Sequence, residues 1–189
     1  KRYNDWSAKG IFQRIFRTLS ADSDTEWVFI DGSYVKAHQH SAGAASHDQE
    51  AIGLSRGGKT SKIHLAVDGY GLPIAFEITG GEVHDAKAAP DLLAQVSIGV
   101  MLVADTGYDS QAIRDRVESS GKATSIPRRK NSKIGNSGLD KCMYSLRHLV
   151  ENMFARLKHF RAIATRYDKL KRNFVSLVAL ACAFIWLPM

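Results

Sequence analysis

Two aspartates stand where apolar segments stop, and their position suits metal binding. Asp31 follows WVFI and Asp105 follows VMLVA, and each is followed by a small residue or a glycine. A carboxylate held at a strand terminus by a rigid sheet is a good ligand for a hard divalent cation. Asp-Gly is also a common turn signal, so either aspartate taken alone could simply cap a turn. The pair, on what read as two central strands, favours a metal site.

A third carboxylate, Glu151, is the single acid in the basic stretch YSLRHLVENMFARLK, which covers residues 144–158. At about 100° per residue, a helix would place four residues on one stripe beside a broad apolar face: Tyr144, Arg147, Glu151 and Lys158. Glu151 would then stand at the border of the buried face and could reach over a sheet edge. The simpler alternative is an Arg147–Glu151 pair worth about 0.2–0.5 kcal/mol, and helical geometry leaves it open.

The elements that must position these residues follow from hydrophobic periodicity and turn residues. Helices are predicted over 1–20 (one or two short basic ones), 84–96, 110–121, 144–158 and the apolar C-terminal run, strands over 27–40, 100–105 and the start of 123–133, a hairpin over 62–81, and a mobile loop over 41–60. Strands that later alternate with helices imply a mixed sheet with helices on both faces. Functional groups gather at the carboxyl ends of strands in such sheets, where Asp31 and Asp105 are both expected.

Composition favours a nucleic-acid partner in a reducing compartment. The formal net charge is +7 and the pI is about 9.5, which favours a polyanion, although ribosome association or chance would also fit. Two cysteines in apolar helical segments form neither a disulfide framework nor a zinc motif, so the cytoplasm is expected. The C-terminal run FVSLVALACAFIWLPM is shorter than the roughly 20 residues that span a bilayer, and it reads as a buried helix.

The stretch 144–158 fits the pattern Y-(2)-R-(3)-E-(6)-K without a gap. This pattern resembles the motif of the DDE transposases of bacterial insertion sequences, in the superfamily often labelled four-and-five. Three further segments are similar to that family and occur in the expected order: IDGSYVKAHQHSAGA, GLSRGGKTSKIHLAVDGYGLPIAFEITGGEVHD and VADTGYDS. The similarity runs from about Trp27 to the C-terminus and therefore covers most of the chain.

The resemblance implies a ribonuclease-H-like α/β fold and a catalytic triad of Asp31, Asp105 and Glu151. It also implies two Mg²⁺ or Mn²⁺ ions, with Asp31 bridging both and the other two carboxylates each completing one site. Two such ions can serve the attacking and leaving oxygens of phosphodiester chemistry together. Water would first expose the transposon 3′-OH, which would then attack target DNA without a covalent protein intermediate.

The same resemblance assigns DNA contacts to cationic residues outside the triad. Arg147 and Lys158 are expected to hold phosphates near the scissile bond, and Tyr144 either contacts DNA or packs against the sheet. Further expected contacts, each of which could instead be a solvated loop charge, are Lys36, Arg56, Lys59, Lys62, Arg128, Arg129 and Lys130. The last three lie in PRRKNSK, whose four cations in seven residues could follow a phosphate backbone. Asp85 matches the family within His84-Asp85, or simply caps the next helix.

The expected partners are transposon ends, bound sequence-specifically at terminal inverted repeats, and target DNA, within a homodimeric synaptic complex and without a membrane. The expected location is the bacterial cytoplasm, in association with the nucleoid. Residues 1–25 are interpreted as the remnant of an N-terminal helical DNA-binding region, and residues 26–189 as the ribonuclease-H-like catalytic domain. Two alternatives stay open: a metal-dependent nuclease of the same fold without strand transfer, and a non-catalytic DNA-binding relic.

Overall fold

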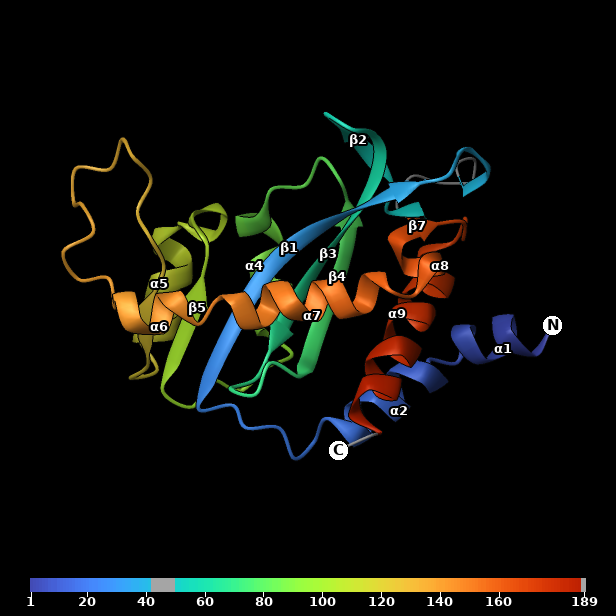
Figure 1. The fold of residues 1–189 in the computed structure, drawn as a ribbon, viewed down its shortest axis with the longest axis horizontal. Coiled ribbons are helices and arrows are strands. Elements are labelled where there is room, and N and C mark those ends of the chain that lie inside the picture. Colours follow the sequence, from blue (N-terminus) through green and yellow to red (C-terminus); the bar gives the residue numbers. More distant parts are fainter. Residues whose placement is uncertain (42–49, 188–189) are drawn as a thin grey trace.

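The computed structural model describes residues 1–41 and 50–187, in which one mixed sheet carries helices on both faces (Figure 1). The strands are β1 (Trp27–Ala37), β2 (Gly53–Ser55), β3 (Gly58–Val67), β4 (Pro73–Gly80), β5 (Met101–Ala104), β6 (Ala123–Ser125) and β7 (Thr165–Arg166). The helices are α1 (Arg2–Ala8), α2 (Ile11–Leu19), α4 (Asp85–Leu93), α5 (Gln111–Glu118), α6 (Lys141–Ser145), α7 (His148–Lys158), α8 (Arg161–Ala164) and α9 (Lys171–Trp186), with short 3₁₀ turns η1 (Gln39–Ser41) and η2 (Thr106–Tyr108).

The sheet combines an antiparallel half with a parallel half, and β1 belongs to both. The strand order is β2-β3-β1-β5-β6, with β4 paired to β3 and β7 paired to the end of β1. β3 runs antiparallel to β1 and to β4, whereas β5 runs parallel to β1 and to β6. The predicted hairpin is confirmed as β3 and β4, and the Asp68 carboxylate closes its turn by accepting hydrogen bonds from the amides of Tyr70 and Leu72.

Alternating side chains of the central strands fill two separate cores. Phe29 of β1 and Leu65 of β3 face one core, which α2, α7 and α9 cover. Val28 and Ile30 face the other core, which α4 and α5 cover from the far side of the sheet. This period of two gives β1 one face directed at α7 and one directed at α4, and each polar side chain of the strand lies on one or the other.

The terminal helices pack against each other beside the sheet. The predicted short basic helices are α1 and α2, and α2 places Phe12 and Phe16 in the core shared with α9. The C-terminal apolar run forms α9, and it buries Phe174, Val178 and other residues, as predicted. Across the residues described, no helix combines the length and apolarity that a membrane crossing requires.

The loop predicted over residues 41–60 is wrong for 53–55 and for 58–60, which form strands. Residues 42–49 lie outside the described part, but β2 and the beginning of β3 form a second short hairpin at Gly53–Ser55 and from Gly58 onward. Glycine and serine content suggested a loop. However, the pairing of β3 with β1 continues as far as Lys36 opposite Thr60, so the beginning of β3 is held in a strand conformation. Tertiary pairing therefore outweighs local composition here.

Arg166 joins the outer ends of β1, β3 and α9. Its side chain is fully buried. Its guanidinium donates to Ser61 Oγ at 2.6 Å and to the carbonyl oxygens of Ala51, Asp168 and Lys169. It also lies 4.9 Å from the centre of the Phe174 ring. Burial lowers the pKa of Arg166 to about 10, and nearby acidic groups offset only part of that effect.

We expect Arg166→Met to reduce the free energy of unfolding by several kcal/mol, because it removes hydrogen bonds from a charged group, each worth about 1.5–3 kcal/mol. Urea denaturation followed by circular dichroism measures the change. The matched control is Arg161→Met, which removes an exposed arginine from the preceding helix. Equal losses in the two variants would show that the hydrogen bonds of Arg166 do not stabilise this corner.

Candidate active site

The register of β1 and β5 places Asp31 and Asp105 side by side. The parallel pairing runs from Trp27 opposite Met101 to Ile30 opposite Ala104, and the two aspartates are the next residues on each strand. β5 ends there, but β1 continues to Ala37 because its pairing with β3 continues. The strand predicted over 27–40 is therefore confirmed in β1, but the expectation that Asp31 lies at a carboxyl end is wrong. Asp31 lies within β1, at the point where its parallel neighbour stops.

Each aspartate also accepts a local backbone hydrogen bond. Asp31 Oδ1 accepts from the Gly32 amide at 2.7 Å, and Asp105 Oδ1 accepts from the Gly107 amide at 2.8 Å. Asp105 thereby caps the 3₁₀ turn η2, so the capping interpretation holds for this residue alongside any other role. For Asp31 the turn interpretation is wrong, because Gly32 is inside a strand.

Arg147 links Asp31 to Glu151 across the front of the sheet. α7 crosses β1 on the face opposite α4 (Figure 1). The Arg147 guanidinium donates to Asp31 Oδ2 at 2.8 Å and also to Glu151 Oε1. The Arg147–Glu151 pair expected from helical spacing is thus present, but the same guanidinium also binds Asp31. One cation therefore holds two of the three candidate carboxylates together.

The pKa shifts show how closely charge is concentrated here. Burial lowers the pKa of Arg147, but the charges of Asp31 and Glu151, with smaller contributions from Tyr144 and Asp105, outweigh it and raise the pKa above its ordinary value. Burial raises the pKa of Asp31, and the nearby charge of Asp105 adds to this, although the Gly32 amide and Arg147 favour ionisation. All three carboxylates therefore act on one small region.

Two residues of the Y-(2)-R-(3)-E-(6)-K pattern, Arg147 and Lys158, contact β1, and the four residues do not lie on one continuous helix. α6 ends at Ser145 and α7 begins at His148, and the residues between them form i→i−3 hydrogen bonds such as Arg147 N to Tyr144 O. Tyr144 is on α6, and its ring centre lies 5.9 Å from the Arg147 guanidinium carbon. At the other end, Lys158 donates to Ser33 Oγ on β1 at 2.6 Å.

Residues 22–186 match a family model described as the transposase DDE domain. The chain belongs to the DDE transposase family. A putative transposase for insertion sequence element IS6501 from Brucella ovis is 35% identical over 128 residues, which cover 68% of this chain and 98% of that protein. A putative transposase for insertion sequence element IS402 from Burkholderia cepacia is 29% identical over 136 residues, which cover 66% of this chain and 62% of that protein.

Among solved structures, the transposase domain aligns with a piggyBac transposase synaptic complex with hairpin DNA. The TM-score is 0.50 at 12% identity, over 85% of this chain and 46% of that chain. At this identity the likeness concerns the fold alone, and it agrees with the ribonuclease-H-like mixed sheet. The predicted family, fold class and enzyme class are therefore confirmed: the chain is a DDE transposase domain, with transposition catalysis as its activity.

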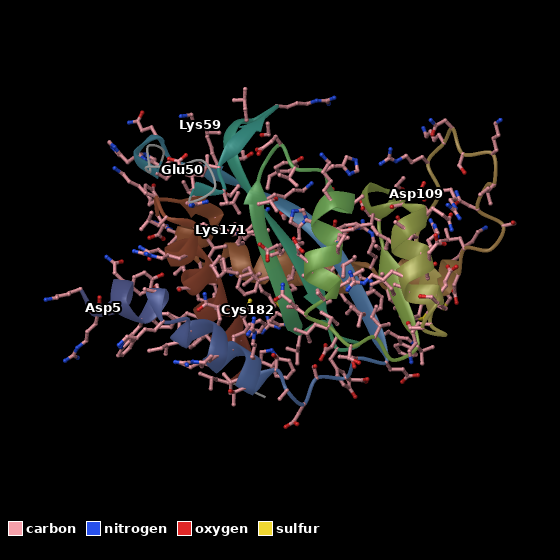
Figure 2. The ribbon with its side chains drawn as sticks, turned by 180° about the vertical axis from the view of Figure 1, so that it is seen from behind. Asp5, Glu50, Lys59, Asp109, Lys171 and Cys182 are labelled. Carbon is pink, nitrogen blue, oxygen red and sulfur yellow. The ribbon has the colours of Figure 1, made fainter. Side chains whose placement is uncertain are left out.

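Of the DNA contacts predicted between residues 36 and 62, three are exposed to solvent and one, Lys62, is buried. Lys36 is exposed on β1, and Arg56 and Lys59 are exposed on the β2–β3 hairpin, which Figure 2 shows at an outer end of the molecule through Lys59. A groove of about 540 Å³ borders this hairpin and includes Arg56 among its lining residues. Lys62 differs from these cations, because it is 4% exposed and faces Asp85 rather than solvent.

The basic loop that carries Arg128, Arg129 and Lys130 is tied to the domain by Asp109 (Figure 2). Asp109 accepts from Arg114 Nη2 and from the Arg129 amide, both at 2.9 Å, and Arg128 Nη1 lies 3.7 Å away. The Arg129 side chain is 3.2 Å from His84 Nε2 at the start of α4. The loop is thus held beside the strand ends that carry the aspartates.

Sequence reasoning missed the roles of Asp85 and Asp109. Asp85 does not cap α4, since His84 is the N-cap and its Nδ1 accepts from the Ala86 amide. Instead, both Asp85 oxygens face Lys62 Nζ, at 2.7 and 2.8 Å. The available signals were the His84-Asp85 dipeptide and the glycines shortly after Asp31 and Asp105.

We expect Asp109→Asn to lower the free energy of unfolding by roughly 1–3 kcal/mol at neutral pH, since it removes hydrogen bonds to a charged group. Burial opposes ionisation of Asp109, but Arg114, the Arg129 amide and Arg128 lower its pKa below the ordinary value. Its stabilisation is therefore complete above about pH 4, the unfolded pKa, and disappears as the pH falls through the lower folded pKa.

Urea denaturation of the wild type and of Asp109→Asn between pH 7 and pH 2 tests this, because the difference between them should vanish on acidification. Asp115→Asn, an exposed change on α5, is the matched control. A difference that persists unchanged at the acid end of the series would contradict the assignment.

Proposed function

We propose that this transposase domain cleaves DNA at the 3′ ends of a transposon and joins those ends to target DNA, with Asp31, Asp105 and Glu151 as its catalytic residues. The observation that carries this proposal is the register that aligns Asp31 with Asp105, together with the Arg147 guanidinium that connects Asp31 to Glu151. Three acidic groups from a central strand, a neighbouring strand end and a crossing helix thereby act on one point.

The chemistry of this donor set suits a divalent cation. Among the residues described, no three His, Cys, Asp or Glu side chains stand close enough together to hold a metal ion, and Arg147 lies between two of the carboxylates. Carboxylate oxygens are nevertheless the ligands that Mg²⁺ and Mn²⁺ prefer, and three of them direct their charge at the existing cation. We propose that Asp31, Asp105 and Glu151 would hold two such ions, which activate the attacking oxygen and stabilise the leaving oxygen.

The reaction then takes two displacements at phosphorus. Water attacks the scissile phosphodiester, an oxygen–phosphorus bond forms, and the bond to the 3′ oxygen breaks to leave a transposon 3′-OH. That hydroxyl next attacks a phosphodiester of target DNA and displaces the 3′ oxygen of the target strand. Neither displacement requires a covalent bond to the protein, which agrees with a site built from carboxylates and cations.

The cations beside the triad would bind the substrate. Arg147 and Lys158 carry donors on the same face of β1 as Asp31, and each is suited to a phosphate oxygen. Tyr144, beside Arg147, would contact the DNA at the same point. Lys36, Arg56 and Lys59, with the loop that holds Arg128, Arg129 and Lys130, would extend the contact to flanking phosphates.

The wider assembly belongs to the same proposal. We infer that the domain acts on terminal inverted repeats and target DNA in the bacterial cytoplasm, in association with the nucleoid, and within a homodimeric synaptic complex. Residues 1–25 are proposed to derive from the region that recognises the repeats, although α2 also contributes to the core of the domain.

We expect Glu151→Gln to reduce joining of a pre-cleaved transposon end to a target plasmid by roughly 100-fold or more, the scale of losing a group that stabilises developing charge. DNA binding should persist, because the variant removes no cation. Asp105→Asn should behave in the same way, and Asp91→Asn, an exposed change on α4, is the control. Cleavage without joining by the wild type would favour a nuclease, binding alone would favour a relic, and equal joining by Glu151→Gln would refute the site.

We expect Arg147→Gln to bind Mn²⁺ more tightly than the wild type, because it removes the cation that competes for Asp31 and Glu151. Joining should fall in the same variant, because a phosphate contact is lost. Calorimetric titration with Mn²⁺ and the joining assay measure the two effects. Arg156→Gln, an exposed change on α7, is the matched control, and unchanged joining by Arg147→Gln would rule out the phosphate contact.

A further inference from the structure

Two glycines beside the proposed catalytic aspartates leave room for one further carboxylate, that of Asp85. A Cβ atom at Gly32 would lie 2.4 Å from Asp85 Oδ1, and a Cβ at Gly107 would lie 2.9 Å from Asp85 Oδ2 and 2.8 Å from Asp105 Oδ1. Neither glycine has a positive φ, so backbone conformation does not require glycine at either position. The requirement is steric, because the Asp85 carboxylate occupies space that both side chains would need. Lys62 Cε, 2.9 Å from a Cβ at Gly32, also crowds that position.

Asp85 is fixed in this place by buried polar groups. Lys62 Nζ lies 2.7 and 2.8 Å from its two oxygens, and the Tyr34 ring covers the same ammonium at 4.6 Å. His64, which is fully buried, has Nδ1 3.3 Å from Asp85 Oδ1, and its Nε2 is held by Thr79 Oγ1 at 2.9 Å. Removing one partner of a buried ion pair strongly destabilises the folded protein, because the other charge is left without compensation. These contacts therefore keep the Asp85 carboxylate in position.

Asp85, Lys62 and His64 lie on the face of the sheet opposite the candidate active site. Gly32 pairs with His64, and Tyr34 pairs with Lys62, across the β1–β3 ladder. Because side chains alternate along a strand, these positions face away from Asp31. Burial raises the pKa of Tyr108 well above its ordinary value, and the charges of Asp85, Asp31 and Asp105 raise it further. The charges of all three carboxylates therefore act on one buried tyrosine.

We propose that Asp85 is a positioning residue that sets the separation of Asp31 and Asp105. Its carboxylate is wedged between the backbone at Gly32, one residue after Asp31, and the backbone at Gly107, two residues after Asp105. The β1–β5 pairing ends just before both aspartates, so the ladder alone does not fix the distance between them. Lys62 and His64 hold the wedge in place. This role rests on the proposed function, since the separation matters only if both aspartates act together.

The experiment uses the full chain and three measurements: Mn²⁺ affinity by calorimetry, kcat and KM for DNA joining, and the melting temperature. Asp85→Ala removes the wedge, and we expect Mn²⁺ affinity to fall on the order of 10-fold and kcat to fall with it, while KM for DNA stays unchanged. Asp85→Asn keeps the shape of the wedge and should retain most of the Mn²⁺ affinity. Asp91→Asn, an exposed change on the same helix, is the control.

Gly32→Ala tests the same contact from the other side. Its added methyl group collides with Asp85, so we expect a lower melting temperature and the same loss of Mn²⁺ affinity. In the double variant Gly32→Ala/Asp85→Ala the methyl group no longer meets the Asp85 carboxylate, and its remaining close contact is with Cε of the flexible Lys62 side chain. The fall in melting temperature should therefore be smaller than the sum of the two single effects.

Three outcomes would overturn the proposal: wild-type Mn²⁺ affinity and kcat in Asp85→Ala, an equal loss in Asp85→Asn and Asp85→Ala, or additive effects of Gly32→Ala and Asp85→Ala. The joining assay of Glu151→Gln separates this from a failure of the proposed function. If Glu151→Gln loses joining and Asp85→Ala does not, only the positioning role is wrong. If Glu151→Gln joins DNA as the wild type does, the triad itself is wrong.

Discussion

The unequal length of two paired strands is the constraint on which the candidate site depends. β5 ends at Ala104 while β1 continues beyond Ile30, so the sheet has a step immediately before Asp31 and Asp105. Asp31 and Asp105 are both only partly buried at this step. Polar groups there can be ionised and reachable while a buried strand still fixes their backbone. The strand residues leading up to the step are apolar, with Val28, Ile30, Leu102 and Ala104 fully buried.

Concentrating acidic groups at this step creates a repulsion that the domain must balance. In front of the sheet, Arg147 accomplishes this by binding Asp31 and Glu151, and behind it Lys62 does so by binding Asp85. The two cations differ in a way that matters for function. Arg147 has a planar fork that can exchange one oxyanion for another, whereas Lys62 is enclosed by Tyr34 and the sheet. The ion pairs of Arg147, on the face proposed for chemistry, can therefore be replaced by contacts to a phosphate. The Lys62–Asp85 pair on the opposite face stays in place.

Much of the fold could be predicted from the sequence, because strong periodicity and local turn residues carry it. The β3–β4 hairpin, the helices α4 and α5 and the buried α9 all follow from such signals. The predictions failed where long-range pairing decides the structure. The β2–β3 hairpin replaces part of a predicted loop because β3 pairs with β1 as far as Lys36, and the same pairing places Asp31 inside a strand and not at its carboxyl end. The sequence also gave no sign of the break between α6 and α7, because the apolar helical pattern continues across it.

The candidate site also contains residues that a sequence pattern indicates and residues whose role depends on long-range contacts. The proposed triad and the four residues of the Y-(2)-R-(3)-E-(6)-K pattern could be named from the family resemblance, whereas the sequence left Asp85 open between a family match and a helix cap. An acid directly after an N-cap residue carries no information about the groups that lie across the sheet. The informative residues were the glycines, since a strand interior that contains Gly32 loses packing unless something else fills the space. A glycine inside a strand without a positive φ points to a close neighbour, and here that neighbour is the carboxylate of Asp85.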